Sequence, residues 1–126
     1  MTPIGSGIDI VEIQRLQEII DKNGNRFAEK VLHPNELEEL AEWNNKTAFI
    51  AKRFAVKEAT AKALGTGIGK MLAFKDMYVD HDEFGKPLLV FTEECKARLK
   101  LQDKHALLTI ADEKAYAVAH VMLFVD

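Results

Sequence analysis

The chain has 126 residues, of which 48% are hydrophobic and 29% are charged, and its formal net charge is −3. This composition excludes a disordered or low-complexity chain, and the length suits a single domain that can bury roughly two-thirds of its unfolded surface. Proteins that bind nucleic acid usually carry an excess of basic residues, so the small acidic excess counts against that class.

The first half of the chain is predicted to form one strand and then several helices. Their expected ranges are a strand over 3–11 and helical segments over 12–22, 27–32, 37–40 and 44–64. Gly5 and Gly7 interrupt the strand, and an isolated glycine in a strand marks a bulge or a place where another backbone or a ligand comes close. The last helix is rich in alanine and apolar nearly all round, so it is expected to be central and largely buried.

The second half is predicted to form two hairpins with a helix between them. The expected hairpins join 74–80 to 88–91 and 105–110 to 116–125, and the helix covers 93–101. Strands and helices are mixed rather than strictly alternating, so the sequence favours an α+β fold. Neither a repeat nor a linker is visible, which predicts one domain over residues 1–126.

The cysteine content and the hydropathy pattern predict a cytoplasmic protein that does not enter a membrane. The single cysteine, Cys95, cannot form an intramolecular disulfide, and the start of the chain does not resemble a signal peptide. No apolar run approaches the roughly 20 residues that a membrane span needs. Cys95 follows two acids, Glu93 and Glu94, which disfavour its thiolate, so it is interpreted as structural.

Charged residues on the long buried helix are the first candidates for chemistry. Glu58 and Lys62 are four residues apart and share a face, and Phe54 lies one turn earlier on that face. Arg53 and Lys57 form a second pair beside them. A salt bridge on a half-exposed helix would also explain Glu58 and Lys62, but the apolar surroundings favour a functional site, because buried charges are costly unless they are paired or bind a ligand.

A glycine-rich turn, Gly65-Thr66-Gly67-Ile68-Gly69, follows this helix. Such a turn allows a phosphate to approach the backbone closely, and bare N–H groups in it can act as donors. It is not a P-loop, because a P-loop precedes its helix. A helix C-cap followed by a turn is the structural alternative, and it explains one glycine better than three.

Asp9 lies between two isoleucines in the predicted strand, where a carboxylate is unfavourable unless it has a function. A solvent-facing strand residue or a helix N-cap is the alternative interpretation. If Asp9 and Glu58 converge, they offer two hard oxygen ligands to Mg²⁺, which commonly uses one or two carboxylates with phosphate oxygens and waters. The nearby lysines and arginine would then suit a polyphosphate. The histidines lack zinc-type spacing, and no nucleophile elbow or Cys/His pair is present.

Two motifs carry a family resemblance. One is Gly7-Ile8-Asp9-Ile10-Val11-Glu12-Ile13, closed by Arg15, and the other is Phe-x-x-Lys-Glu-x-x-x-Lys-Ala-x-Gly-Thr-Gly over residues 54–67. They resemble the two signatures of the holo-acyl-carrier-protein synthases, which are phosphopantetheinyl transferases. Residues 26–32 and Gly85-Lys86-Pro87 are also similar, so the match spans the whole chain.

The resemblance implies a reaction in which the 4′-phosphopantetheine arm of coenzyme A moves to a serine of apo-acyl carrier protein, with release of adenosine 3′,5′-bisphosphate. This reaction supports fatty acid biosynthesis. By the same resemblance, Asp9 and Glu58 hold Mg²⁺ against the pyrophosphate of coenzyme A, and Lys62 binds phosphate and completes the catalytic group. The residues implied to hold the nucleotide end are Arg53 and the turn residues Gly65, Thr66 and Gly67.

The resemblance also implies the 4′-phosphopantetheinyl transferase fold, with an antiparallel sheet around the long helix, and a homotrimer with an active site at each subunit interface. Arg15 would meet the acidic carrier protein, and Lys22 and Arg26 would extend a basic stripe if the first helix continued through Gly24. Acidic residues on the same helix dilute the stripe, so a solvated charged face is the alternative. Many family members carry a histidine where this chain has Asp112, which cannot supply a cation to a phosphate.

Two other functions stay open on the residues alone. One is a magnesium-dependent phosphotransferase or hydrolase that acts on a nucleotide through the same pair, Asp9 and Glu58. The other is a non-catalytic module that binds coenzyme A or a nucleotide. In the transferase, the proton of the serine would pass to a metal-activated water or to a carboxylate such as Glu58.

Overall fold

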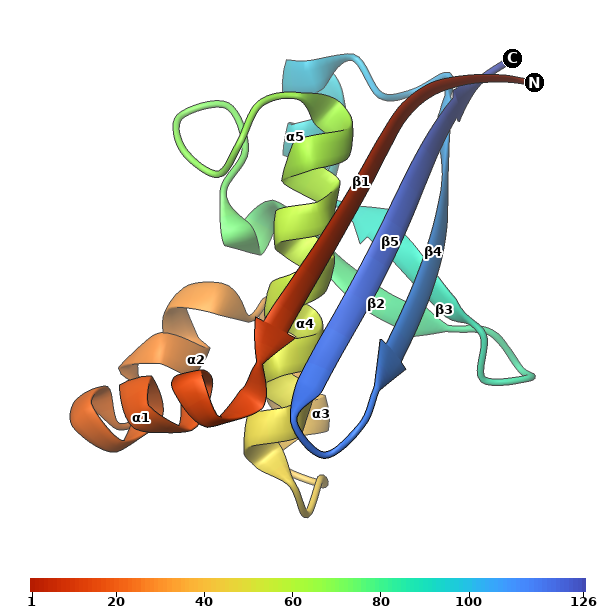
Figure 1. The fold of residues 1–126 in the computed structure, drawn as a ribbon. Coiled ribbons are helices and arrows are strands. Elements are labelled where there is room, and N and C mark those ends of the chain that lie inside the picture. The colour runs from red at the N-terminus through yellow and green to blue at the C-terminus, as the bar shows by residue number, and fades with distance from the viewer.

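The computed structural model describes residues 1–126 and confirms the α+β class (Figure 1). Its elements are β1 (Thr2–Glu12), α1 (Ile13–Asn23), α2 (Arg26–Val31), α3 (Pro34–Leu40), α4 (Lys46–Leu64), the 3₁₀ turn η1 (Phe74–Asp76), β2 (Met77–His81), β3 (Pro87–Phe91), α5 (Glu93–Leu99), β4 (Lys104–Asp112) and β5 (Tyr116–Val125). All the predicted strands and helices are present. Several boundaries differ by one to three residues. For example, the residues from Phe74 to Asp76 form η1, and the strand begins only at Met77.

Two antiparallel sheets make up the β part of the fold. β5 is the middle strand of the larger sheet, with β1 and β4 at its edges, and β2 pairs with β3 in a separate two-stranded sheet. One face of the larger sheet packs against α4, and the other face is covered by no helix (Figure 1). This uncovered side is called the outer face below.

The helix α4 lies at the centre of the molecule, as the sequence predicts, and the short helices α1 to α3 lie around its N-terminal half (Figure 1). The side chain of Asn45 caps it by accepting a hydrogen bond from Ala48 N at 3.0 Å. Gly65 ends it in the left-handed conformation, with a φ of 76°. The helix is buried on most sides because the sheet, the short helices and the β2–β3 hairpin all pack against it.

Two glycines let β1 cross α4 with the two backbones in contact. A Cβ atom built on Gly5 would lie 2.2 Å from Ala63 O, and one built on Gly7 would lie 1.9 Å from Ala59 O. Any side chain at either position would push the strand away from the helix. The predicted close backbone approach is therefore confirmed, and a register shift between Pro3 and Gly5 confirms the bulge.

A smaller core fills the space between α4, α5 and the β2–β3 hairpin. Cys95 is free and fully buried there, together with Leu72 and Met77. Burial raises the pKa of the Cys95 thiol, and the nearby Asp76 adds to the shift, so the thiolate is disfavoured as expected, although by a different acid. No helix of the structure is both long enough and apolar enough to cross a membrane.

Candidate active site

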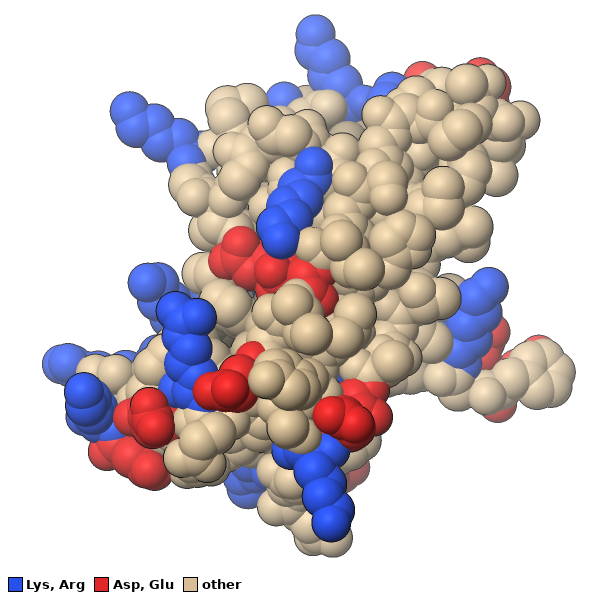
Figure 2. Space-filling view, in the orientation of Figure 1, with Lys and Arg blue, Asp and Glu red and all other residues tan.

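Asp9 and Glu58 come together where β1 crosses α4. Both line a cavity of about 200 Å³, which α1 borders on its other side. Asp9 faces this cavity because side chains alternate along β1, and its neighbours Ile8 and Ile10 are 59% and 64% exposed on the outer face. Glu58 projects into the cavity from α4, one turn after Phe54. On the face drawn in Figure 2, acidic atoms gather below a single basic side chain. The convergence on which the magnesium hypothesis depends is therefore present.

Lys62 is attached to the strand. Its Nζ donates to Ile8 O at 2.8 Å and to Asp9 Oδ1 at 3.1 Å. The salt bridge between Lys62 and Glu58, the structural alternative for this pair, is not formed, because the ammonium group turns to β1 instead. The side chain of Lys62 is 54% exposed, so the ammonium group can turn toward a ligand without crossing packed atoms.

Glu58 has a raised pKa. Partial burial is the main cause, because it disfavours the charged form, and the neighbouring carboxylate of Asp9 raises the pKa further, while Lys62 opposes the shift. Two carboxylates that are held close together repel each other, and a bound cation would relieve this repulsion. The electrostatics of the pair therefore suit a cation site.

The chemistry of the donors fits Mg²⁺ only if a ligand completes the site. No group of three or more His, Cys, Asp or Glu side chains in the structure could hold a metal ion. Mg²⁺ needs only one or two carboxylates when phosphate oxygens and waters provide the remaining ligands. Asp9 and Glu58 provide this minimum, and Lys62 adds a positive charge beside Asp9.

An aromatic row extends from the cavity wall. Phe27 and Phe54 line the cavity with their ring centroids 5.7 Å apart, and the ring of Phe54 lies 5.8 Å from that of Phe74. Sequence reasoning placed only Phe54 near Glu58. It missed Phe27 and Phe74 because the segments that carry them meet α4 only in the folded chain.

Arg53 and Lys57 belong to a buried ion cluster, so the structure does not bring Arg53, a predicted nucleotide-binding residue, to the cavity of Asp9 and Glu58. Lys57 is fully buried, and its Nζ donates to Glu36 Oε1 at 2.6 Å and to Val31 O at 2.7 Å. Arg53 is 3% exposed and pairs with Glu36 at 3.6 Å and with Glu39 at 3.3 Å. These partners lie on α2 and α3, on a side of α4 away from Asp9, so Arg53 lies outside the cavity of the two carboxylates.

Glu36 is the acceptor at the centre of this cluster. Its Oε1 also accepts from His33 N at 3.0 Å, and its Oε2 accepts from Val79 N at 3.0 Å, so the carboxylate links α3 to β2 as well as to α4. Burial lowers the pKa of Lys57, and the charge of Glu36 opposes that shift. The cluster is structural. It fixes the rotation of α4 that turns the adjacent Glu58 toward β1.

The glycine-rich turn uses its own N–H groups to cap α4. Gly65 N donates to Lys62 O at 3.1 Å, and the N–H groups of Thr66 and Gly67 donate to Ala61 O at 3.2 and 3.4 Å. The alternative of a C-cap and turn is therefore confirmed, and the idea of bare donors at these residues is wrong. The two glycines have positive φ values and no atom within 4 Å of a built Cβ, so the turn is open to a ligand.

The basic residues near the cavity lie on two helices. α1 ends before Gly24, whose φ is 61°, and α2 begins at Arg26. Arg15 and Lys22 therefore belong to α1 and Arg26 to α2, so the condition for one continuous stripe, a first helix that continues through Gly24, is not met. Only Arg15 lines the cavity of the two carboxylates. Lys and Arg side chains alternate with Asp and Glu over these helices (Figure 2).

Asp112, at the end of β4, lines a different cavity of about 300 Å³. The other residues of that cavity include Ile10 and Glu113, and none of them is basic. As the sequence indicates, this position brings no cation to a phosphate.

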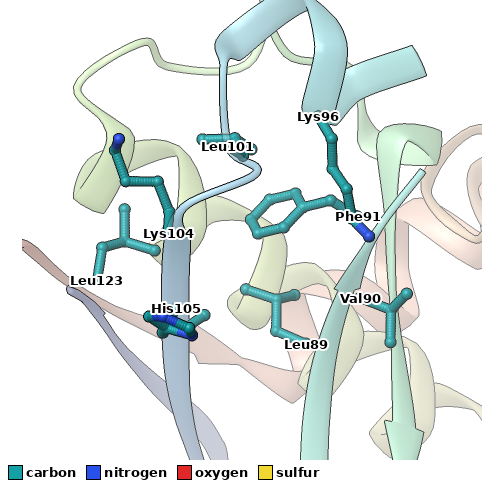
Figure 3. Close-up of a pocket in the computed structure, with 9 residues that line it drawn as sticks. Leu89, Val90, Phe91, Lys96, Leu101, Lys104, His105 and Leu123 are labelled. Atoms are coloured by element: carbon teal, nitrogen blue, oxygen red, sulfur yellow. The ribbon is translucent and has the colours of Figure 1, made fainter. Parts of the chain in front are cut away.

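A further cavity of about 380 Å³ lies between β3 and β4 (Figure 3). Apolar side chains such as Leu89 and Phe91 line it. Its rim carries three basic side chains, each of which is paired with an acid: Lys96 with Glu93, Lys104 with Asp103, and His105 with Asp126. This cavity offers neither a carboxylate nor a free cation, so the cavity of Asp9 and Glu58 is the candidate active site.

The sequence has clear relatives. Residues 5–121 match the family model of the 4′-phosphopantetheinyl transferase superfamily. The chain is 48% identical to the holo-[acyl-carrier-protein] synthase of Shewanella frigidimarina over 124 residues, which cover 98% of each sequence. It is 46% identical to the enzyme of the same name from Photobacterium profundum, with the same coverage.

Solved structures share the fold. The crystal structure of holo-[acyl-carrier-protein] synthase from Neisseria meningitidis aligns with a TM-score of 0.92 and 35% identity, over 98% of this chain and 99% of that one. The Helicobacter pylori synthase in complex with coenzyme A aligns with a TM-score of 0.83 and 32% identity, over 94% and 99% of the two chains. The chain therefore belongs to the 4′-phosphopantetheinyl transferase superfamily and is an enzyme of the holo-[acyl-carrier-protein] synthase type.

Proposed function

We propose that the chain transfers the 4′-phosphopantetheine arm of coenzyme A to a serine of an apo-acyl carrier protein, in a Mg²⁺-dependent reaction that releases adenosine 3′,5′-bisphosphate. The observation that carries the proposal is the convergence of Asp9 and Glu58 in one cavity, with Lys62 bound to Asp9. The complex of the Helicobacter pylori relative with coenzyme A supports the choice of co-substrate. The product would serve fatty acid biosynthesis in the cytoplasm.

The reacting diphosphate needs positive charge and a fixed position more than covalent help. Asp9 and Glu58 would hold Mg²⁺ against its oxygens, and the ion would neutralise charge that builds up on the departing bisphosphate. Lys62 would turn from Asp9 to a phosphate oxygen and add a second positive charge. The exposed position of its ammonium group leaves room for this movement.

The remaining parts of the substrates suit the surroundings of the carboxylates. The phenyl rings of Phe27 and Phe54 would pack against the uncharged pantetheine arm. Arg15 at the cavity, with Lys22 and Arg26 nearby on two helices, would attract an acidic carrier protein. The open turn at Gly65, Thr66 and Gly67 would receive the nucleotide end of coenzyme A one helical turn beyond Lys62.

We also propose that the outer face of the larger sheet joins copies of the chain into a homotrimer. The apolar side chains exposed on it include Ile8, Ile10 and Leu107, which are 59%, 64% and 49% exposed. A cavity of about 480 Å³ lined by Ile8, Asp9, Ile10, Lys62 and Val118 connects this face to the carboxylates. A second copy seated on the face would thus border the active site.

The decisive experiment uses purified protein, coenzyme A, Mg²⁺ and an apo-acyl carrier protein, with the intact mass of the carrier as the readout. A mass gain of one phosphopantetheine arm, lost when Mg²⁺ is chelated, is the expected result. Breakdown of the nucleotide without modification of the carrier would select a phosphotransferase or hydrolase instead. Binding of coenzyme A without turnover would select a binding module.

A further inference from the structure

The segment over residues 65–74 connects the end of α4 to the aromatic row, and an arginine of α5 holds its second half. Arg98 Nε donates to Met71 O at 3.0 Å, and Arg98 Nη2 donates to Asp76 Oδ2 at 2.5 Å. The guanidinium group therefore bridges the segment and η1 with two hydrogen bonds in a fork. Such a fork fixes direction as well as distance, since its planar donors cannot rotate independently.

Asp76 continues this tether back into the segment. Its Oδ2 also accepts from Ala73 N at 2.8 Å, so Arg98 is joined to the backbone on both sides of Leu72, directly at Met71 and through this carboxylate oxygen at Ala73. The backbone oxygen of Asp76 accepts from Thr92 N at 2.9 Å, at the start of α5. Leu72 itself is fully buried in the smaller core. These contacts give the second half of the segment a single position.

The first half of the segment has few contacts of its own. Gly67 and Gly69 have no atom within 4 Å of a built Cβ, and Gly69 N donates only to Leu72 O, at 2.9 Å. The exposed turn is therefore fixed at one end by the cap of α4 and at the other end by Leu72 and the Arg98 fork. Loss of the fork would free one of these two ends.

We propose that Arg98, together with Asp76, is a positioning residue for coenzyme A. The pair holds the segment over 65–74 so that its open turn stands where the nucleotide end of coenzyme A binds. The inference rests on the proposed function and adds two residues to it that lie outside both sequence motifs. Arg98 does not line the cavity of Asp9 and Glu58, so its effect is on binding of the nucleotide and not on the transfer step.

The test replaces Arg98 and measures separately how the protein binds the nucleotide half and the phosphopantetheine half of coenzyme A. Arg98→Ala should raise the KM for coenzyme A about tenfold, since two charge-assisted hydrogen bonds are lost, and should leave kcat and the KM for the carrier within about twofold. By calorimetry, the variant should bind adenosine 3′,5′-bisphosphate more weakly and bind 4′-phosphopantetheine as the parent does. A general loss of structure would instead weaken the binding of both fragments.

Three further variants define the contact. Arg98→Lys can keep one of the two hydrogen bonds, so its KM for coenzyme A should be intermediate. Asp76→Asn should also raise the KM for coenzyme A. The double variant should have a KM no higher than that of Arg98→Ala alone, because both changes disrupt the same Arg98–Asp76 contact. Lys96→Ala is the matched control on α5, since Lys96 pairs only with Glu93 of the same helix.

An unchanged KM for coenzyme A in Arg98→Ala, in protein that still modifies the carrier, would overturn the inference. So would an equal loss of affinity for both fragments. If Arg98→Ala is too unstable to assay, Arg98→Lys and Asp76→Asn are tested instead, by the same comparison of affinity for the two fragments. If the parent protein fails to modify the carrier at all, the proposed function fails, and the calorimetric comparison still reports on the tether.

Discussion

The carboxylates of Asp9 and Glu58 oppose each other's charge, and this has a consequence for stability as well as for catalysis. The pKa of Glu58 is raised in the folded protein, so the folded state holds its proton more tightly than the unfolded state does. Stability therefore falls as the pH rises from the ordinary glutamate pKa through the folded-state pKa of Glu58, and the penalty remains at neutral pH. A bound cation would remove part of it.

Glu58→Gln should lower the rate of carrier modification by about 100-fold or more, because a charged group at the reacting diphosphate is lost. The same change should keep or raise the melting temperature in chelator at pH 7, because it removes the repulsion. Below the ordinary glutamate pKa, where the Glu58 carboxyl of the parent is itself protonated because its pKa is raised, the two melting temperatures should converge. Glu38→Gln, on an exposed carboxylate, is the control. Full activity in Glu58→Gln would refute its assigned role.

At the scale of elements, the site depends on how closely β1 lies on α4. Alanines on the helix and glycines on the strand leave no side chain between the two backbones, which brings Asp9 within reach of Lys62. The buried cluster around Glu36 holds α4 from its other side. One seam of small residues and one buried ion cluster thus determine the position and the rotation of the central helix.

Gly7→Ala should destabilise the fold by about 1–3 kcal/mol, because the added methyl group overlaps Ala59 O and must displace the strand. It should also lower activity, since Asp9 moves with the strand. Urea unfolding and the carrier mass assay measure the two effects. Gly69→Ala, where a Cβ meets open space, should change stability by less than about 0.5 kcal/mol. Equal stability of the two variants would contradict the close approach.

Lys57→Met should destabilise the fold by about 3–5 kcal/mol, because it leaves the Glu36 carboxylate buried with Arg53 as its nearest cation. The change is measured by urea unfolding. Lys70→Met, on an exposed lysine, provides the comparison and should be nearly neutral. A Lys57→Met protein as stable as the parent would show that the cluster does not hold α4.

At the scale of the whole molecule, the outer face is the feature that a single chain leaves unexplained. Apolar side chains are exposed on a sheet face on which no helix packs. Side chains alternate along the edge strand β1, so successive residues of this strand point to the outer face and to the cavity of the carboxylates. The proposed trimer would therefore affect the mass of the particle and its activity together.

Leu107→Glu should convert the assembly to monomers, because a charge would be buried in the proposed apolar interface. Light scattering after size-exclusion chromatography gives the mass, and the carrier assay gives the accompanying loss of activity. Phe84→Glu is the control, since Phe84 is 87% exposed at the tip of the β2–β3 hairpin. A parent protein that is already monomeric and fully active would rule out the trimer.

The sequence by itself determined the order and type of the elements, the α+β class and the pair of carboxylates. Periodicity, glycines and caps act between neighbours in the chain, so they can be read without the fold. The unusual position of Asp9 between two isoleucines could be recognised for the same reason, because alternation along a strand is a local rule.

Only the tertiary structure decided which charges lie together at the candidate site. Arg53, Lys57, Glu58 and Lys62 follow one another on the same helix, yet two of them are buried against Glu36 and the other two meet β1. The partner of Lys57 lies 21 residues away and that of Lys62 lies 53 residues away, so neither pairing is written in the local pattern. The burial and pairing of a charge depend on what the fold packs against it.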